Sequence, residues 1–376
     1  MNNLSKAEKL HILFAVSYMK IGGSERVASL LCNEWVAQGN KVTLVITYQG
    51  FDPPEYPLDS RIKIIYLSSS IYLSKIKLLN QLNRLLSLRN IVKELKPNII
   101  ISFITNVNIA IILSTLWLKI PIIISERTNP KEDIYTSLEY RVIRRLLYRF
   151  AKVLVVQTES LRTIFEKYMP KRKIHIIPNP IVFPLPIYEP KIHPENIVEN
   201  NKKLLLSVGR LEYEKGFDIL IEAIGNIYSQ FENWRFVILG EGSLRDKLMA
   251  LIIRYRLESK VLLPGKVGNI ETWYKRADLF VMSSRYEGFP NALLEAMVYS
   301  IPVVTFDIPG TREIIENFGS GWLVDPKSGA LGLVKTLLPV MNQIENGQIT
   351  KKMPVIPKCY DISTVSSQWL GLLEFK

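Results

Sequence analysis

The feature that most constrains this chain is a repeated alternation of short β-branched runs with helical patterns, found in two successive series. The first series includes apolar runs at 11–17, 41–47 and 152–158, and the second restarts at Lys203. A buried run followed by an amphipathic helical stretch is typical of a βαβ unit, whose parallel sheet is covered on both faces. We therefore expect an α/β fold with two doubly wound, Rossmann-like domains.

The two series are separated by a proline-rich stretch that predicts the domain boundary. Six prolines fall between residues 178 and 194, and proline at this density resists regular structure. The length of 376 residues also suits two domains better than one core. We predict domains at 1–180 and 201–357, followed at 358–376 by a C-terminal helix whose packing partner the sequence does not show.

One uncharged stretch, 99–118, is long enough to cross a bilayer. Asn106 and Asn108 interrupt it, and a second apolar run follows a proline, so two buried strands around a buried helix explain it better. The first residues lack the apolar region of a signal peptide, and the two cysteines lack metal-ligand spacing. A cytoplasmic protein is the expectation.

The net charge of +13 belongs entirely to the first half of the chain. Residues 1–185 carry 26 Lys and Arg against 13 Asp and Glu, and the remainder carries 22 of each. The excess is concentrated in two leucine-rich helical patterns, 75–96 and 141–152. Basic residues interleaved with Leu and Ile favour an anionic membrane surface. Nucleic acid is not expected, because no nucleic-acid-binding motif accompanies the charge.

Ligands of open parallel sheets bind at the carboxyl ends of the strands, and the second series carries suggestive residues there. Arg210 and Lys215 follow one strand, where two cations could hold a diphosphate. Gly240 and Gly242 follow the next, where freed amides at a helix start could approach an anion. The segment 261–269 could border a planar base. Each of these features alone is also typical of an ordinary turn.

The stretch SRYEGFPNALLEA places one glutamate before a helix and another inside it. Pro290 suits the first helical turn, so Glu287 lies in the preceding loop and Glu295 about a turn inside. We expect the free N–H groups of Asn291 and Ala292 to favour a bound phosphate. Glu287 would then face sugar hydroxyls and Glu295 a ribose, although each glutamate singly could be a surface residue.

In combination, these residues resemble the retaining glycosyltransferases of family 4. The resemblance is carried by Arg210 and Lys215 in SVGRLEYEKG, the LGEG turn, EGFPNALLE at 287–295 and PGTREII at 309–315. It covers nearly the whole chain, because IGGSERV at 21–27 looks like the family's glycine-rich loop. The implied architecture is GT-B, two Rossmann-like domains facing a central cleft.

The resemblance implies a role for each matching residue. Arg210, Lys215 and Glu287 would form the catalytic set, with the two cations on the diphosphate and Glu287 on the transferred sugar. Gly22 and Gly23 would let an acceptor or donor phosphate approach closely. The implied donor-binding residues are Glu295, Gly240, Gly242, Phe289, Pro290, Asn291, Ala292 and Leu294.

The sequence contains no Asp-x-Asp, the usual ligand set for a metal-bridged diphosphate. We therefore expect no metal cofactor, with Arg210 and Lys215 in the metal's electrostatic role. The chain departs from the family at SERTNP, where many relatives have a histidine after Ser-Glu. Glu126 and Arg127 remain acceptor-side candidates, although an arginine cannot serve as a base at neutral pH.

The resemblance implies a hexosyltransferase or N-acetylhexosaminyltransferase, retaining and metal-independent, with a UDP-sugar as co-substrate. Its acceptor would be a polyprenyl-diphosphate-linked or other glycan, in O-antigen, capsule or exopolysaccharide biosynthesis. It would work peripherally on the inner face of the cell membrane. A nucleotide-sugar epimerase or hydrolase of the same architecture, or a non-catalytic membrane-associated donor-binding subunit, is the alternative.

Overall fold

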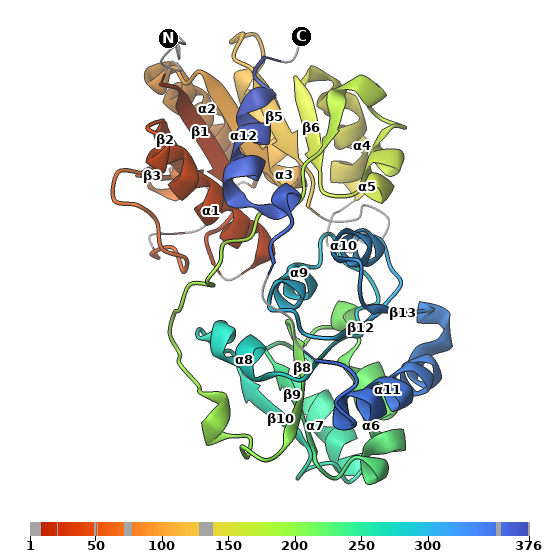
Figure 1. Cartoon of the computed structure of the whole chain (residues 1–376). Helices are drawn as coiled ribbons and strands as arrows, with labels where there is room; N and C mark the ends of the chain where they lie inside the picture. The colour runs from red at the N-terminus through yellow and green to blue at the C-terminus, as the bar shows by residue number, and fades with distance from the viewer. Residues whose placement is uncertain are drawn as a thin grey trace, which may run out of the picture. The chain divides into compact units, whose positions relative to one another are not determined.

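The computed structural model describes residues 9–20, 22–48, 50, 52–70, 77–127, 138–350 and 355–374. The chain divides into two compact units (Figure 1). The first comprises Met1–Pro180 together with Cys359–Lys376, and the second comprises Ile181–Lys358. The proline-rich segment after residue 180 therefore belongs with the second unit, and the C-terminal segment returns to the first.

The first unit is built on a parallel sheet with the strand order β3-β2-β1-β4-β5-β6-β7. The order reverses between β1 and β4, which is the signature of a doubly wound fold. Its strands are β1 (His11–Val16), β2 (Lys41–Ile46), β3 (Lys63–Tyr66), β4 (Ile99–Phe103), β5 (Ile122–Ser125), β6 (Val153–Val156) and β7 (Ile174–Ile176). The last of these lies just before the proline-rich stretch and was not among the strands that the sequence predicted.

Helices cover both faces of this sheet, as the alternation of side chains along β1 shows. Ile12 and Phe14 pack with one cluster, and Leu13 and Ala15 pack with the other. The helices are α1 (Gly23–Ala37), α2 (Lys77–Leu95), α3 (Thr105–Thr115), α4 (Leu138–Leu147), α5 (Glu159–Phe165) and α12 (Ile362–Gly371). The uncharged stretch forms β4 and α3, followed by β5, as predicted. None of the helices in the described ranges is long and apolar enough to span a bilayer.

The C-terminal helix α12 packs on α1 in the first unit. Trp369 is 1% exposed, and its ring lies 5.7 Å from that of Phe103. Lys152 Nζ donates to the carbonyl of Leu373 at 2.6 Å. Asp361 caps the helix, because its Oδ2 accepts from the N–H groups of Ser363 and Thr364. This supplies the packing partner that the sequence did not show.

The second unit has a six-stranded parallel sheet with the order β10-β9-β8-β11-β12-β13. Its strands are β8 (Lys203–Val208), β9 (Trp234–Leu239), β10 (Val261–Gly265), β11 (Leu279–Met282), β12 (Val303–Phe306) and β13 (Trp322–Val324). Its helices are α6 (Phe217–Ile227), α7 (Arg245–Arg254), α8 (Ile270–Arg276), α9 (Asn291–Val298), α10 (Thr311–Phe318) and α11 (Gly329–Glu345). Here the order reverses between β8 and β11.

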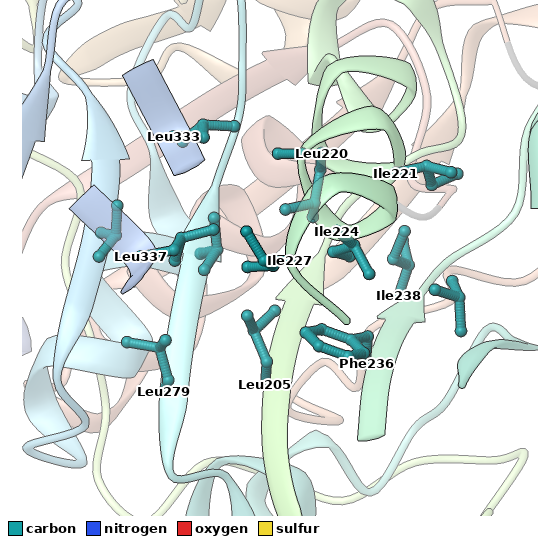
Figure 2. Packing of buried hydrophobic residues seen from close by; sticks show 14 of the residues in the cluster. Leu205, Leu220, Ile221, Ile224, Ile227, Phe236, Ile238, Leu279, Leu333 and Leu337 are labelled. Carbon is teal, nitrogen blue, oxygen red and sulfur yellow. The ribbon is translucent and has the colours of Figure 1, made fainter. Parts of the chain in front are cut away.

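The core of the second unit lies between the sheet and helices α6 and α11 (Figure 2). Leu220, Ile224 and Ile227 recur on one face of α6 and meet Leu205 of β8 and Phe236 of β9. Figure 2 shows Leu333 and Leu337 of α11 on the neighbouring side of the same core. This packing anchors the strands whose carboxyl ends carry the candidate site.

Two helices of the second unit begin later than the sequence pattern suggests. The pattern from Glu214 predicts one helix, but Tyr213–Lys215 form a 3₁₀ turn and α6 begins at Phe217. Gly216 separates them with a φ of 62°, a left-handed conformation that interrupts a right-handed helix. Likewise, α7 begins at Arg245 rather than Ser243, and residues 240–244 form a loop.

Candidate active site

The candidate site of the second unit lies where the strand order reverses. β8 and β11 are neighbours there, and the loops that follow them, 209–216 and 283–290, leave the sheet at its carboxyl edge. A crevice outside this edge is where open α/β sheets bind their ligands. Arg210 and Lys215 belong to the first loop and Glu287 to the second, so the fold brings the predicted catalytic residues to one place.

Close backbone contacts join these two loops. A Cβ at Gly216 would lie 2.1 Å from the carbonyl oxygen of Ser283, so only glycine fits. Ser283 Oγ donates to the carbonyl of Lys215 at 3.0 Å. Arg285 forms a bidentate pair with Asp218 at 2.9 and 2.6 Å, with its guanidinium 4.2 Å from the Tyr213 ring centroid. The position of Lys215 relative to β11 is thereby fixed.

Lys215 and Glu287 form an ion pair. Lys215 Nζ lies 2.7 Å from Glu287 Oε1 and 2.9 Å from Oε2, and Ser284 Oγ donates to Oε1 at 2.7 Å. The side chain of Lys215 is 19% exposed and that of Glu287 is 10% exposed, so the pair is mostly buried but still in contact with water. A cation and a carboxylate held at a strand edge can bind a diphosphate and a hydroxyl group respectively.

Arg210 is placed differently from Lys215. Its Nη2 lies 2.7 Å from Glu214 Oε1, and its side chain is 65% exposed. Glu214 itself is only 9% exposed, so the carboxylate is anchored while the guanidinium reaches solvent. Arg210 and Lys215 thus both follow β8, and each is paired with its own glutamate.

The glycines after β9 serve loop packing. A Cβ at Gly240, whose φ is 141°, would lie 1.9 Å from the carbonyl oxygen of Gly209, and one at Gly242 would lie 2.5 Å from that of Leu211. The Gly240 N–H donates to the Gly265 carbonyl, so this amide is not free for an anion.

At the start of α7, an internal carboxylate occupies the position that we predicted for an anion. Ser243 donates from its N–H to Glu212 Oε1 at 2.8 Å and from its hydroxyl to Oε2 at 2.6 Å. The hydrogen bonds from the Ser243 side chain, together with its N–H, lower the pKa of Glu212.

Helix α9 begins at Asn291, so Glu287 precedes it and Glu295 lies inside it, as predicted. The Asn291 N–H donates to the Phe289 carbonyl at 3.0 Å, and the Leu293 and Leu294 N–H groups donate to the Pro290 carbonyl. The expectation of a free Asn291 amide is therefore wrong, because the chain turns tightly through Pro290 before the helix. Leu294 is 1% exposed and belongs to the domain interior.

Glu295 is held deeper than a surface residue. It is 5% exposed, and Tyr274 Oη donates to its Oε2 at 2.9 Å and to the Ala292 carbonyl at 3.3 Å. The Tyr274 and Tyr299 rings stack with their centroids 5.8 Å apart. Burial raises the pKa of Tyr299, and the carboxylates of Glu271 and Glu295 add to this shift. Because Glu295 is buried and hydrogen-bonded, it is not an ordinary surface glutamate.

In the first unit, the predicted phosphate loop precedes α1. Gly22 is extended, with a φ of −176°, and Gly23 is the first residue of the helix. A Cβ at Gly22 would lie 2.2 Å from Glu25 Oε2, and Ser24 Oγ donates to the same oxygen at 2.8 Å. The space that Gly22 leaves is therefore filled by the Glu25 carboxylate, an anion that the helix start favours.

Glu126 is enclosed by the first unit. It is 1% exposed, and Thr105 Oγ1 donates to both carboxylate oxygens at 2.8 and 3.0 Å. Tyr148 Oη donates to Oε1, and Arg144 Nη1 lies 4.0 Å from the same atom. Burial and the nearby Glu126 raise the pKa of Tyr148. Contact between Glu126 and an acceptor would require this network to open.

Arg127 lies at the carboxyl edge of the first sheet, directly after Glu126. Its Nη1 donates to Asn179 Oδ1 at 2.7 Å, and its guanidinium carbon lies 3.8 Å from the ring centroid of Phe103. Burial lowers the pKa of Arg127 to about 9, and the charge of Glu25 partly offsets this. The side chain therefore remains a cation at neutral pH.

Comparison with known proteins places both units in one enzyme class. Residues 189–345 match the profile of Glycosyl transferases group 1, and residues 21–182 match that of Glycosyltransferase Family 4. The chain belongs to the family 4 glycosyltransferases. The two parallel-sheet domains are those of the GT-B fold, as predicted from the sequence motifs.

Among similar proteins, an undecaprenyl-diphosphate-directed enzyme of Campylobacter jejuni aligns over nearly the full length. It is named GalNAc-α-(1→4)-GalNAc-α-(1→3)-diNAcBac-PP-undecaprenol α-1,4-N-acetyl-D-galactosaminyltransferase, and it is 27% identical over 97% of this chain and 98% of its own. The amylovoran biosynthesis glycosyltransferase AmsD of Erwinia amylovora is 27% identical over 82% and 84%. The solved structure of Anabaena HepE in complex with UDP matches with a TM-score of 0.74, at 18% identity over 97% and 100%.

Several residues that shape the candidate site of this glycosyltransferase were not predicted from the sequence. Ser284, which donates to Glu287, stands three residues before it in the same quoted stretch and could have been found there. Tyr274 comes from α8, 21 residues before Glu295, and nothing in its own segment distinguishes it from a core tyrosine. The Arg285–Asp218 pair likewise joins loops that only the sheet order brings together.

Proposed function

We propose that this family 4 glycosyltransferase moves a sugar from a UDP-sugar to a lipid-diphosphate-linked glycan. The observation that carries the proposal is the Lys215–Glu287 pair at the reversal between β8 and β11. It sets a cation and an anchored carboxylate beside the start of α9, at the edge where such sheets bind nucleotides. The matching HepE structure holds UDP, which favours uridine as the donor's base.

In this proposal Lys215 binds the donor's diphosphate and stabilises the negative charge that develops as the nucleoside diphosphate leaves. Arg210, whose side chain is exposed although it is paired with the buried Glu214, binds the same phosphates. Once Lys215 engages phosphate, Glu287 is released to accept hydrogen bonds from the transferred sugar. Glu295, held by Tyr274, accepts from the ribose with its second oxygen. Gly240, Gly242 and the 289–292 backbone keep the neighbouring loops in place.

The transfer is proposed to need no metal, because Lys215 and Arg210 can supply the positive charge that a bridging cation would provide. The sequence contains no Asp-x-Asp to hold such a cation. The test is transfer in the presence of EDTA, followed by addition of Mg²⁺ or Mn²⁺. Unchanged activity is expected, whereas loss with EDTA and recovery with either ion would remove this part of the proposal.

The acceptor class and the stereochemistry are inferred from the Campylobacter relative. Its name gives an undecaprenyl-diphosphate-linked acceptor and an α-1,4 linkage. The common UDP-hexoses carry an α bond to the diphosphate, so an α product would retain the anomeric configuration. We take the sugar to be a hexose or N-acetylhexosamine, in the assembly of a surface polysaccharide. Proton NMR of the product's anomeric signal tests retention, and a β product from an α donor would refute it.

The first unit offers a surface suited to the membrane that holds such an acceptor. The outer face of α4 and the following turn carries Arg145 and Arg149 together with exposed Val142, Leu146 and Phe150. Basic and apolar side chains in this arrangement bind anionic lipid headgroups and the interface beneath them. Arg144, although it belongs to the basic pattern at 141–152, is 3% exposed and its Nη1 lies 4.0 Å from Glu126 Oε1, so it is not part of this surface.

One assay separates the proposal from its alternatives. The enzyme is incubated with radiolabelled UDP-sugars and lipid extract, and the Lys215→Ala and Glu287→Ala variants are run in parallel. Label should pass to the lipid fraction with the wild type and fall by roughly 100-fold or more with either variant. Interconversion of donor sugars without lipid would instead indicate an epimerase. Donor binding without any turnover would indicate a non-catalytic subunit.

A further inference from the structure

The guanidinium of Arg127 has two hydrogen-bond donors, Nε and Nη2, that no group in the described part of the chain accepts. Its Nη1 donates to Asn179, whereas its Nε and Nη2 are buried and have no hydrogen-bond partner among the residues that the structure describes. More than nine in ten buried polar groups in folded proteins are paired, so such a cation needs an explanation. The side chain is also fixed in place, stacked 3.8 Å from the Phe103 ring centroid.

Two other arginines of this chain show what that fork accepts. Arg61 donates from Nε and Nη2 to the two oxygens of Asp59, at 2.9 and 2.7 Å. Arg312 uses the same two nitrogens on the two oxygens of Asp307. In both cases the Nε–Nη2 edge binds a pair of oxygens on one anionic group, the geometry that suits carboxylate and phosphate.

The position of Arg127 argues for a ligand rather than an internal partner. The residue follows β5, at the carboxyl edge of the first sheet, and its guanidinium lies over Phe103 at the end of β4, the strand beside the reversal. Gln157, which follows β6 at the same edge, has a buried Oε1 that also lacks a hydrogen-bond partner in the described ranges. Two adjacent strands thus end in polar groups whose hydrogen bonds are incomplete.

From this geometry we propose that Arg127 is a substrate-binding residue of the first domain, whose Nε–Nη2 fork takes two oxygens of a substrate phosphate group. The inference rests on the proposed function, because donor and acceptor both bring a diphosphate. Asn179 and Phe103 hold the guanidinium so that little side-chain entropy is lost on binding. An arginine at this position therefore selects substrates by charge, a role that a neutral histidine could not fill.

The test uses inorganic pyrophosphate as the probe. In wild-type protein, the Nε–Hε NMR signal of Arg127, assigned by its absence in Arg127→Lys, should shift as pyrophosphate is added. Thermal unfolding with pyrophosphate provides a second measurement, in an Arg210→Ala/Lys215→Ala background that removes the two cations proposed to bind phosphate in the second domain. The ligand-induced rise in Tm should vanish on adding Arg127→Gln and persist on adding Arg172→Gln, an exposed control with the same charge change.

A signal that ignores pyrophosphate, or an equal rise in Tm with and without Arg127→Gln, would overturn the proposal. Without ligand, Arg127→Met should leave Tm equal or higher, because it removes a buried cation with two unsatisfied donors while keeping the stem on Phe103. A lower Tm would point to a structural role instead. If UDP shifts the Arg127 signal, the phosphate group that Arg127 binds belongs to the donor. If pyrophosphate shifts the signal and UDP does not, the phosphate group belongs to the acceptor. Pyrophosphate binding without any sugar transfer would leave this inference standing and refute only the proposed function.

Discussion

Lys215 Nζ lies 2.7 Å from Glu287 Oε1, and this ion pair joins the loop after β8 to the loop after β11. The pair gives the two side chains a defined position at the reversal of the sheet before any phosphate arrives. In the proposed complex, the donor's diphosphate competes with Glu287 for Lys215. Donor binding and release of the carboxylate would then be one event.

The ion pair predicts strong coupling between its two members. Lys215→Met removes the cation paired with the Glu287 carboxylate, which is 10% exposed. Glu287→Gln removes the carboxylate paired with Lys215. We expect a coupling free energy of about 1–3 kcal/mol in a double-mutant cycle measured by urea unfolding. The Lys191–Glu189 pair, with side chains 49% and 75% exposed, is the matched control and should show under about 1 kcal/mol. Equal coupling in the two pairs would contradict the shielding that we describe.

Gly216→Ala should destabilise the second domain. The residue has a φ of 62°, and the added Cβ would lie 2.1 Å from the Ser283 carbonyl oxygen. We expect a loss of about 2–3 kcal/mol in the free energy of unfolding, because both conformational strain and a backbone clash oppose the methyl group. Gly371→Ala is the control, since nothing lies within 4 Å of its Cβ position and a helical alanine is favourable. Similar losses in both variants would show that the clash is not the cause.

Glu295→Gln should weaken the binding of UDP without affecting that of pyrophosphate. If Glu295 accepts from the ribose, the change replaces a charged acceptor by a neutral one and costs about tenfold in affinity. Pyrophosphate has no ribose, so its affinity should stay the same. Isothermal titration calorimetry of both ligands measures the difference. A parallel loss for the two ligands would mean that the substitution disturbs the whole loop.

Asp361→Ala should loosen α12, and the effect should depend on pH. Hydrogen bonds from the side chain of Ser363 and the N–H groups of Thr364 and Ser363 lower the pKa of Asp361 below its usual 3.8. The stabilisation is thus fully present above the unfolded-state pKa and is lost as pH falls through the lower folded-state value. At pH 7 we expect a cost of about 1 kcal/mol, measured by urea unfolding followed by tryptophan fluorescence. The cost should shrink towards pH 2, and a cost that grew with acidity would contradict the assignment.

Replacing Arg145 and Arg149 by glutamine should weaken binding to anionic vesicles. Each basic residue near such a surface contributes about 1 kcal/mol, so the double variant should lose roughly 30-fold in affinity at low salt. Vesicle sedimentation measures it, and 0.5 M salt should abolish most of the binding. Arg254→Gln/Arg256→Gln in the second domain, with the same charge change, should bind like the wild type. A loss in that control as large as in the α4 variant would point to net charge rather than to this surface.

The fold was largely predictable, because hydrophobic periodicity records which segments are buried. The runs at 11–17 and 41–47 became β1 and β2 within one residue of their predicted ends. The failures occurred where a local conformation overrides the pattern. Gly216 delays α6 by three residues, and β7 was hidden because Ile174–Ile176 adjoins the first prolines of the linker.

The site was predictable in its charged residues and not in their partners. We singled out Lys215 and Glu287 from the sequence because their residue types suit a diphosphate and a sugar. Their contact spans 72 residues and depends on β8 and β11 being neighbours, which local sequence does not encode. The same holds for Tyr274 with Glu295 and for Arg127 with Asn179, which lie 21 and 52 residues apart.

The return of α12 to the first unit has a consequence for biosynthesis. Val365, Trp369 and Leu372 are part of the first domain's core, so that core cannot close until nearly the whole chain has left the ribosome. Chain synthesis proceeds at about 5–20 residues per second, so the second domain can finish folding before α12 is available to complete the first domain. A gene fragment ending at residue 180 would encode a domain whose apolar contacts with α12 are exposed to water. Supplying residues 359–376 as a separate peptide should restore its solubility.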